Sequence, residues 1–310
     1  MCAALIWRRR MNIAELINPV IVWDLILPGF ALLLVAIGFL GWWLAMHPTD
    51  VQAFLFSLGH RLRAMRAKRC YRTRIELMVQ WFRPEGAFVL SLTIGLALLV
   101  VSVWIFGGVL HAVLGNEAMV RFDRPIVSYV AAHRLGWLTD GMETITCIGS
   151  ELFLGGVICV AGLVLLSRTR TWHPLLLVAV ALLGAMMLEF ATKLVIARPR
   201  PAVVWMALPT TGFAFPSGHS TESTATYGAL AYVIAQTQKD WRAKVASLSA
   251  GAVIVMLIGV SRVYLGVHWP TDVMAGWALG CAWLAIIFTT FSTVEKTRLP
   301  RVPHDPGAQS

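Results

Sequence analysis

The stretch LLLVAVALLGAMMLEFATKLVI, residues 175–196, decides the class of fold. Its only charged residues are Glu189 and Lys193, and the others are almost all apolar. An α-helix needs roughly 20 consecutive apolar residues to cross the hydrocarbon core of a bilayer. The stretch has that length and that composition, so it predicts a membrane-spanning helix.

The composition of the whole chain also indicates a membrane protein. Of its 310 residues, 58% are hydrophobic and only 14% are charged, and the mean hydropathy is +0.71. A soluble domain carries about 25% charged residues, because its surface must be wetted. We therefore expect an all-α integral membrane protein. The candidate spans are the apolar stretches 25–46, 87–110, 152–167, 175–196, 221–235, 245–263 and 273–290.

The net charge of +10 comes largely from short basic segments beside the apolar stretches, namely 61–74, 168–173, 239–244 and 296–301. This pattern is typical of cytoplasmic loops that face anionic headgroups, so we expect a membrane partner and no nucleic acid. If the later spans cross alternately, all four segments face the cytoplasm. The connections 113–150, 197–216 and 264–271 then face the other side.

The N-terminus conflicts with this orientation. Arg8, Arg9 and Arg10 should stay inside, yet the first span must run inward to reach the basic segment 61–74. A chain that starts at Met11 has no Lys or Arg before the first span. We therefore expect Met11 to be the true start. The span 25–46 should be retained, because it is too long for the core of a signal peptide.

Two segments between the spans indicate helices on the membrane surface. Residues 51–84 are partly apolar and strongly basic, which favours amphipathic helices at the cytoplasmic interface, although a solvated basic linker fits equally well. Residues 123–148 indicate a similar surface helix on the opposite side, with Pro125 near its start.

Polar residues are costly inside a membrane, so those beside the spans are the first candidates for function. They form three groups at the non-cytoplasmic ends of the predicted spans. The first is KLVIARPRP at 193–201, the second is PSGH at 216–219, and the third is SRVYLGVHWPTD at 261–272.

These groups contain the parts of a phosphate-binding site. Lys193, Arg200 and Arg262 are cations at the ends of predicted helices, and the fork of an arginine suits phosphoryl oxygens. Ser217 and Gly218 precede or begin a helix. There, free N–H groups attract an anion, and glycine lets the backbone come close to it.

His268 and Asp272 look like a nucleophile and the carboxylate that orients it. Pro270 suits the first turn of a helix, which puts Asp272 in that turn and His268 just outside it. The carboxylate can then accept one ring N–H and leave the other nitrogen to attack. His219 is the candidate acid that protonates the departing oxygen. The sequence offers no cluster of carboxylates for two metal ions, so we expect no metal and no cofactor.

Each of these features alone has an ordinary explanation. A single lysine at a helix end commonly snorkels to the interface, and a lone Pro-Ser-Gly-His is a turn before a helix. Glu222 lies one helical turn from His219. A structural hydrogen bond is favoured for it over a role in tuning that histidine.

Together, the three groups resemble the type 2 phosphatidic acid phosphatase family, which shares its core with vanadium haloperoxidases. The signature of that family is Lys, six residues, Arg-Pro; then Pro-Ser-Gly-His; then Ser-Arg, five residues, His, three residues, Asp. This chain matches every position in order, and the spacing selects Arg200 over Arg198.

The resemblance implies a six-helix phosphatase core, formed by the second to seventh spans, and one extra N-terminal transmembrane helix. We expect a lipid phosphatase domain at 87–293. Residues 1–86 would hold the extra helix and the basic segment, and 294–310 would be a disordered tail.

The resemblance also implies roles for the side chains. His268 would form a phosphohistidine, Asp272 would orient it, and His219 would protonate the leaving group. The phosphoryl oxygens would be held by Lys193, Arg200, Ser217, Gly218 and Arg262.

The expected function is metal-independent hydrolysis of a lipid phosphate or diphosphate at the non-cytoplasmic face of a cell membrane. The substrate would be of the undecaprenyl diphosphate, phosphatidylglycerol phosphate or phosphatidic acid type. The lack of glycosylation sequons favours a bacterial inner membrane, with the site on the periplasmic or extracellular face. A lipid phosphotransferase is an alternative. A non-catalytic lipid carrier is another, but the cations and histidines gather at one face instead of lining a path.

Overall fold

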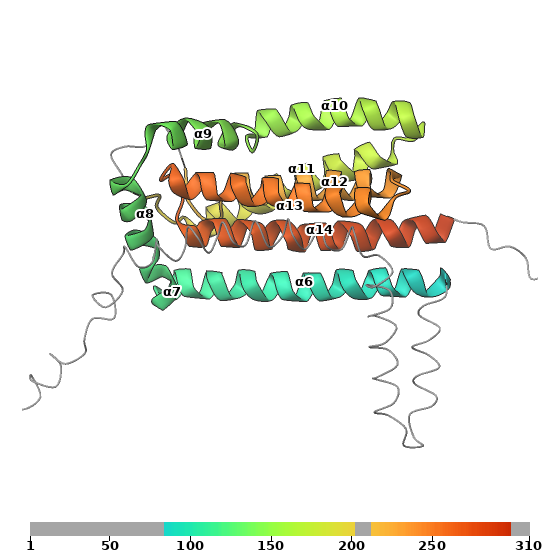
Figure 1. Ribbon diagram of the computed structural model, residues 1–310. Helices are drawn as coiled ribbons and strands as arrows, with labels where there is room; N and C mark the ends of the chain where they lie inside the picture. Colours follow the sequence, from blue (N-terminus) through green and yellow to red (C-terminus); the bar gives the residue numbers. More distant parts are fainter. Residues whose placement is uncertain (1–83, 202–211, 299–310) are drawn as a thin grey trace, which may run out of the picture.

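The computed structural model describes residues 84–201 and 212–298, and the regular elements in these residues are all α-helices. Figure 1 shows long helices side by side, with shorter helices toward one end. The long helices are α6 (Pro84–Gly115), α10 (Glu151–Thr169), α11 (His173–Ile196), α12 (Gly218–Thr237), α13 (Trp241–Tyr264) and α14 (Pro270–Arg298). The shorter ones are α7 (Ala118–Arg121), α8 (Asp123–Ala132) and α9 (Gly136–Cys147).

Five of the described helices are long and apolar enough to cross a membrane. They cover Leu92–Gly115, Glu151–Arg168, His173–Ile196, Trp241–Tyr264 and Pro270–Phe291. These agree with the predicted spans 87–110, 152–167, 175–196, 245–263 and 273–290 to within a few residues. A multi-pass, all-helical membrane protein is confirmed.

Other predictions fall on residues outside the described ranges. They are the span 25–46, the start at Met11, the surface helices over most of 51–84, and residues 299–310 of the tail. The first part of the predicted tail is helical, because α14 continues to Arg298.

The predicted span 221–235 forms α12, but this helix is less apolar than the five spans. Its first turns carry buried polar residues, including Ser220, Thr221 and Glu222. The hydroxyls of Thr221 and Thr224 donate to backbone carbonyls one turn back, at 2.9 and 2.6 Å. α12 packs against α10, α11, α13 and α14. Because protein surrounds α12, this helix needs no apolar outer face. Its hydropathy alone therefore does not identify it as a membrane span.

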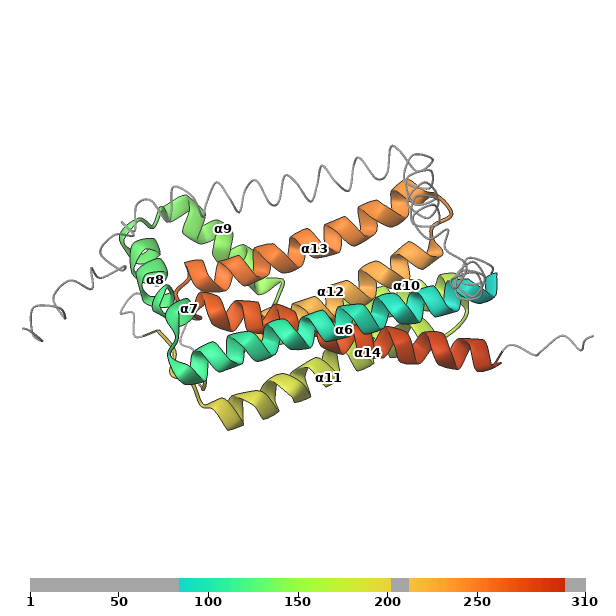
Figure 2. The ribbon, with the colours of Figure 1, turned by 90° about the horizontal axis from the view of Figure 1, so that it is seen from below.

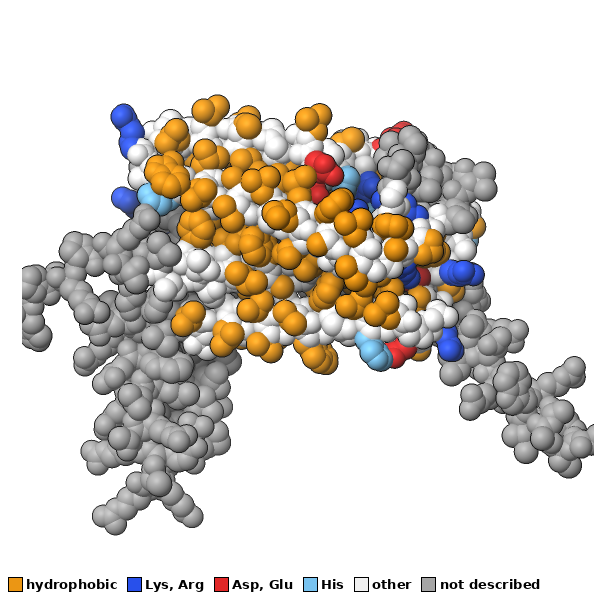
Figure 3. Space-filling model, turned by 180° about the vertical axis from the view of Figure 1, so that it is seen from behind, with side chains coloured by type: hydrophobic (Ala, Val, Ile, Leu, Met, Phe, Trp, Pro, Cys, Tyr) orange, Lys and Arg blue, Asp and Glu red, His pale blue; other side chains and the backbone are white. Residues whose placement is uncertain are grey.

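The outer helices turn apolar side chains outward. Trp104 on α6, Leu163 on α10 and Val195 on α11 are 78%, 69% and 80% exposed. Figure 3 shows hydrophobic side chains spread over most of the face drawn there, with charged side chains at its two ends and a small group of them right of its centre. A soluble protein rarely exposes so continuous an apolar surface, whereas lipid accommodates it without cost.

The segment 123–148 forms two helices, so the prediction of one surface helix was wrong. α8 ends where the His133 amide bonds back to its last turn, and Leu135 is extended before α9 begins. The Leu135 amide donates to the Tyr264 hydroxyl at 3.2 Å. This hydrogen bond holds the break between α8 and α9 against α13. Val130 of α8 packs with Tyr264 and Val267. The two helices therefore support the connection between α13 and α14.

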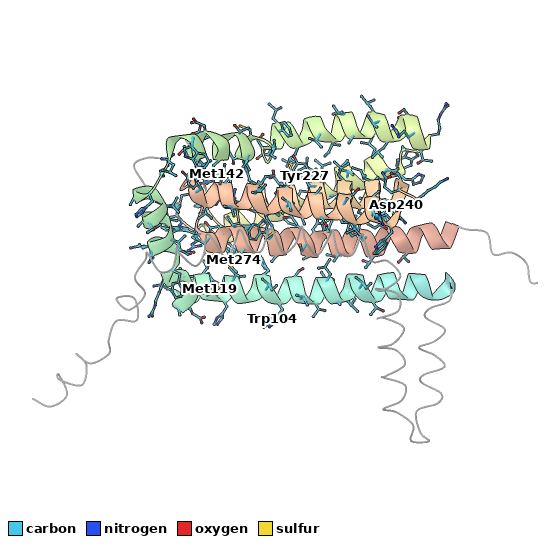
Figure 4. The ribbon with its side chains drawn as sticks, viewed as in Figure 1. Trp104, Met119, Met142, Tyr227, Asp240 and Met274 are labelled. Carbon is cyan, nitrogen blue, oxygen red and sulfur yellow. The ribbon has the colours of Figure 1, made fainter. Side chains whose placement is uncertain are left out.

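The helices alternate in direction, so the two sets of connections lie at opposite ends of the bundle. The basic connections 168–173 and 239–244 share one end, where Figure 4 labels Asp240. The start of α14, marked by Met274 in Figure 4, lies toward the other end, where Figure 2 shows α7 and α8. The three polar groups belong to this second end.

α12 and α14 approach each other closely through two glycines. Gly276 and Gly280 lie one turn apart on α14, and a Cβ atom at either would come within 2.8 Å of a backbone oxygen of α12 or of the residue before it. Small residues four apart let helices pack backbone to backbone in a membrane, where van der Waals packing is a main attractive force. The contact sets the spacing of the two helices that begin at Gly218 and Pro270.

Replacing Gly280 with alanine should destabilise the protein. The new Cβ would lie 2.8 Å from the Thr221 carbonyl oxygen, so the helices would have to separate. Overpacking costs about 1–3 kcal/mol, which for a chain of this size lowers Tm by roughly 5 °C. Tryptophan fluorescence during heating in detergent measures this. Gly107→Ala is the matched control, because nothing lies within 4 Å of a Cβ at that position. Equal Tm values for the two variants would contradict the close contact.

Candidate active site

Four helix ends bring the three polar groups together. They are marked by Lys193 in α11, Gly218 in α12, Arg262 in α13 and Asp272 in α14. Backbone hydrogen bonds join the connections between them. The Ser217 amide donates to the Asp272 carbonyl at 3.0 Å, and the Ala214 amide donates to the Arg198 carbonyl at 2.8 Å.

The ring of His268 has a defined orientation. It is only 2% exposed. Its Nδ1 lies 2.8 Å from the carbonyl oxygen of Ala214, and its Nε2 lies 3.2 Å from Nη1 of Arg200. A carbonyl only accepts and a guanidinium only donates, so Nδ1 carries the proton and Nε2 carries the lone pair. The lone pair therefore faces the cationic side of the site.

The surroundings keep this ring neutral. Burial lowers the pKa of His268 well below its ordinary value, and the charges of Arg262, Arg200 and Lys193 lower it further. The ring of His219 acts in the same direction. The structure thus gathers the cations and both histidines, which are spread over 76 residues of sequence (193–268), within electrostatic reach of one another. The neutral form is the one in which a ring nitrogen can attack.

Asp272 lies in the first turn of α14, after Pro270, with its side chain fully buried. Its Oδ2 accepts from the Trp269 amide at 2.9 Å, as in one half of a capping box. The same oxygen lies 3.5 Å from Nδ1 of His268. The nearer acceptor for that ring N–H is the Ala214 carbonyl. The ring of His268 is therefore oriented by a backbone oxygen as well as by the carboxylate of Asp272.

Arg200 is held by the backbone beside His268. Its Nε donates to the Gly212 carbonyl at 3.1 Å, and its Nη1 donates to the Val267 carbonyl at 3.0 Å. These bonds fix the guanidinium plane next to Nε2 of His268. A planar guanidinium held in this way suits the oxygens of a phosphoryl group.

Arg262 adds a buried donor. It is 4% exposed, and its Nη1 donates to the hydroxyl of Thr146 in α9 at 2.7 Å. Its Nε is buried with no hydrogen-bond partner among the described residues. A buried N–H without an acceptor is costly, and an anion bound here would remove that cost.

Lys193 and Gly218 meet at the start of α12. Lys193 forms an ion pair with Glu189, one turn earlier on α11. A Cβ at Gly218 would lie 2.8 Å from Oε1 of Glu189, so a larger residue here would displace this carboxylate. Ser217 is the extended N-cap residue of α12 and is fully buried. The helix N-terminus is therefore tightly packed and favours negative charge.

His219 is only partly buried, near the start of α12. A Cβ at Gly149, between α9 and α10, would lie 3.4 Å from its Cδ2. Glu222 is 2% exposed, and its Oε2 has no hydrogen-bond partner in the part of the chain that the structure describes. This oxygen therefore does not make the structural hydrogen bond that the sequence favours for Glu222.

The sequence did not indicate that Arg198 binds Asp272, or that Asp123 lies next to the candidate site. Arg198 donates to Asp272 at 2.5 Å and to Asp123 at 2.8 Å. Asp123 begins α8 and is 2% exposed, although the sequence places it on a surface helix. The preference of the motif spacing for Arg200 over Arg198 was a hint that the two arginines have different tasks.

Comparison with known proteins agrees with this arrangement. The PAP2 superfamily matches residues 174–296, which include all three polar groups. A phosphatidylglycerophosphatase B of Bacillus subtilis (strain 168) is 33% identical over 186 residues, which cover 58% of this chain and 88% of that protein. An undecaprenyl-diphosphatase of Sulfolobus acidocaldarius is 27% identical over 179 residues, which cover 56% of this chain and 80% of that protein.

The fold has a counterpart among solved structures. A crystal structure of a transmembrane PAP2-type phosphatidylglycerolphosphate phosphatase from Bacillus subtilis matches with a TM-score of 0.56 and 26% sequence identity. The match covers 67% of this chain and 98% of that one. The chain therefore belongs to the PAP2 superfamily and is one of its membrane lipid phosphatases.

Proposed function

We propose that this protein removes phosphate from a lipid phosphate or diphosphate through a phosphohistidine on His268, without a metal ion. The observation that carries the proposal is the orientation of the His268 ring. Its Nδ1 is bound to the Ala214 carbonyl and its Nε2 faces Arg200. A neutral, oriented imidazole beside a fixed cation is suited to attack a phosphoryl group and to stabilise the charge that develops on it.

The reaction has two steps. In the first, Nε2 of His268 bonds to phosphorus and the bond from phosphorus to the lipid oxygen breaks. Burial and the charges of Arg262, Lys193 and Arg200 lower the pKa of His219, so the negative charge of the bound phosphate must bring this ring to its protonated form before it gives its proton to that oxygen. Asp272 and the Ala214 carbonyl, both close to Nδ1, stabilise the positively charged ring that results. In the second step, water gives a proton to His219 and its oxygen bonds to phosphorus. The P–N bond then breaks and inorganic phosphate leaves.

The remaining phosphoryl oxygens need donors from several directions. Arg200 and Arg262 approach from the connection after α11 and from the end of α13, and Lys193 adds a point charge. The N–H groups of the first turn of α12, which begins at Gly218, and the hydroxyl of Ser217 complete the cradle, while the Ser217 amide stays bound to the Asp272 carbonyl. These groups are separate from the atoms that form and break bonds.

The substrate that we propose has its headgroup in this cradle and its hydrocarbon tails in the bilayer. The similar proteins act on a phosphatidylglycerol phosphate and on undecaprenyl diphosphate, and phosphatidic acid offers the same phosphate chemistry. A lipid phosphotransferase would use the same first step, with the hydroxyl or phosphate of a second lipid in place of water.

We further propose that α6 and α10–α14 form a six-helix core within a phosphatase domain at 87–293. An additional transmembrane helix would lie in residues 1–86. The support for α12 as the sixth helix is its length and its place among α10, α11, α13 and α14. The basic connections would face the cytoplasm, and the site would face the periplasm or the cell exterior.

Purified protein in detergent with EDTA should release phosphate from at least one lipid in a panel of the three substrate types. His268→Ala should lose at least about a thousandfold in kcat, because the bond-forming nitrogen is gone. His111→Ala is the control, because that ring is exposed on α6, with 78% of its side chain accessible. Phosphate release that survives in His268→Ala, or that needs a divalent metal ion, would contradict the mechanism. Phosphorylated acceptor lipid in place of free phosphate would indicate the transferase.

Arg200→Lys should lower kcat/KM by about 100-fold, because lysine keeps the charge but loses the fork beside Nε2 of His268. The rate of phosphate release at low substrate concentration measures this. Arg124→Lys, on the exposed side of α8, is the matched control and should change nothing. A similar kcat/KM for the two variants would remove Arg200 from the set of phosphate ligands.

The proposed orientation predicts which positions are labelled from outside the cell. In a chain whose five cysteines have been replaced, Asp140→Cys and Lys239→Cys each put one thiol on an exposed position at opposite ends of the bundle. A membrane-impermeant maleimide should label position 140 in intact cells, and position 239 only after the cells are permeabilised. The reverse pattern would place the site in the cytoplasm.

A further inference from the structure

A chain of buried charges leads away from the site toward α8. Asp123 at the start of α8, Arg198 after α11 and Asp272 in α14 come from three separate elements. Nη1 of Arg198 donates to Oδ1 of Asp272 at 2.5 Å, and Nη2 donates to Oδ2 of Asp123 at 2.8 Å. The two carboxylates are 2% and 0% exposed, and the arginine side chain is 11% exposed. Water therefore screens these charges weakly.

Thr271 closes the chain into a network. Its amide and its hydroxyl both donate to the carboxylate of Asp123, at 3.1 and 2.5 Å. The same hydroxyl accepts from Nη1 of Arg198 at 2.8 Å. The guanidinium carbon of Arg198 also lies 5.7 Å from the centre of the Trp269 ring. The buried carboxylates thus have partners, as buried charges require.

These contacts separate the task of Arg198 from that of Arg200. Arg198 has its two terminal nitrogens on carboxylates, and its positive charge is offset by two negative ones. It therefore presents no free cation to a phosphate. Arg200, by contrast, is held by carbonyl oxygens beside the ring of His268.

We propose that Asp123 and Arg198 are positioning residues that hold Asp272, and through it His268, in the geometry for attack. Oδ1 of Asp272 is bound by Arg198, and this leaves Oδ2 directed at the Trp269 amide and the His268 ring. Without Arg198 the carboxylate keeps only the bond from the Trp269 amide, so it can rotate or take up a proton, and Nδ1 of His268 then loses the negative charge beside it. The inference rests on the proposed phosphohistidine mechanism and extends the working site to α8.

The geometry of α8 explains why a residue there can influence the nucleophile. Val130 of α8 packs with Leu265 and Val267, which precede His268. Asp123 binds Thr271, three residues after His268. α8 thus contacts the chain on both sides of the nucleophile. Partners behind a catalytic group commonly fix its orientation in this way.

The test is a set of near-isosteric variants in the full-length protein, assayed with the lipid substrate that the parent hydrolyses best. Asp123→Asn removes the charge that holds Arg198 and keeps the size of the side chain. We expect kcat to fall by about 10–100-fold while KM changes by less than about threefold. Lysine cannot bridge two carboxylates, so the kcat of Arg198→Lys should fall by a factor in the same range. Asp140→Asn and Arg124→Lys are the matched controls, because both side chains are exposed on α9 and α8.

A second readout separates positioning from mere support of the fold. Vanadate imitates the five-coordinate phosphoryl group of the transition state, so its binding depends on the position of Nε2 of His268. The inhibition constant of vanadate should rise in Asp123→Asn by about the factor by which kcat falls, whereas that of inorganic phosphate should stay within about twofold. A purely structural role would lower Tm and leave the ratio of the two constants unchanged.

Thr271→Val covers the case in which Asp123→Asn does not fold. It removes only the hydroxyl between Asp123 and Arg198, and a fall in kcat by about three- to tenfold is expected. Parental kcat and vanadate inhibition in the folded variants, or a raised KM with unchanged kcat, would overturn the positioning role. If the positioning role is overturned in this way but His268→Ala is inactive in the same series, the proposed function still stands. A parent chain without activity, or an active His268→Ala, would overturn both.

Discussion

The backbone hydrogen bond from Ser217 to the Asp272 carbonyl joins the start of α12 to the start of α14, and the rest of the site depends on it. One of these helix starts carries the N–H groups that we propose to bind phosphate, and the other carries Asp272, whose carboxylate lies beside His268. The bond is possible because Gly276 and Gly280 let the two helices touch backbone to backbone. A wider spacing would separate the start of α12 from His268, even with every side chain unchanged.

The charges around the site are balanced before any substrate arrives. Lys193 forms an ion pair with Glu189, and Arg198 forms ion pairs with Asp272 and Asp123. Arg200 and Arg262 instead donate hydrogen bonds to carbonyl and hydroxyl oxygens, which are neutral. Arg200 and Arg262 therefore lie on the Nε2 side of the His268 ring and beyond it, whereas Asp272 lies beside Nδ1.

Much of this could be predicted from the sequence, because the signals are local. The apolar lengths predicted five of the spans, and the spacing of the motifs selected the residues that gather around His268. Asp123 could not be found in this way, because its partner Arg198 lies 75 positions further along the chain. The break between α8 and α9 also depends on a distant residue, Tyr264. The segment 221–235 was predicted as a short span and forms α12, whose buried polar residues lower its hydropathy below that of the five other spans.

The polarity of α12 also bears on how the chain enters the membrane. A segment that begins with Ser220, Thr221 and Glu222 gains little by leaving water for hydrocarbon on its own. Its hydroxyls and its carboxyl are buried only once α11, α13 and α14 surround them. α12 is therefore stable in the hydrocarbon layer through contact with these helices and not through its own hydropathy.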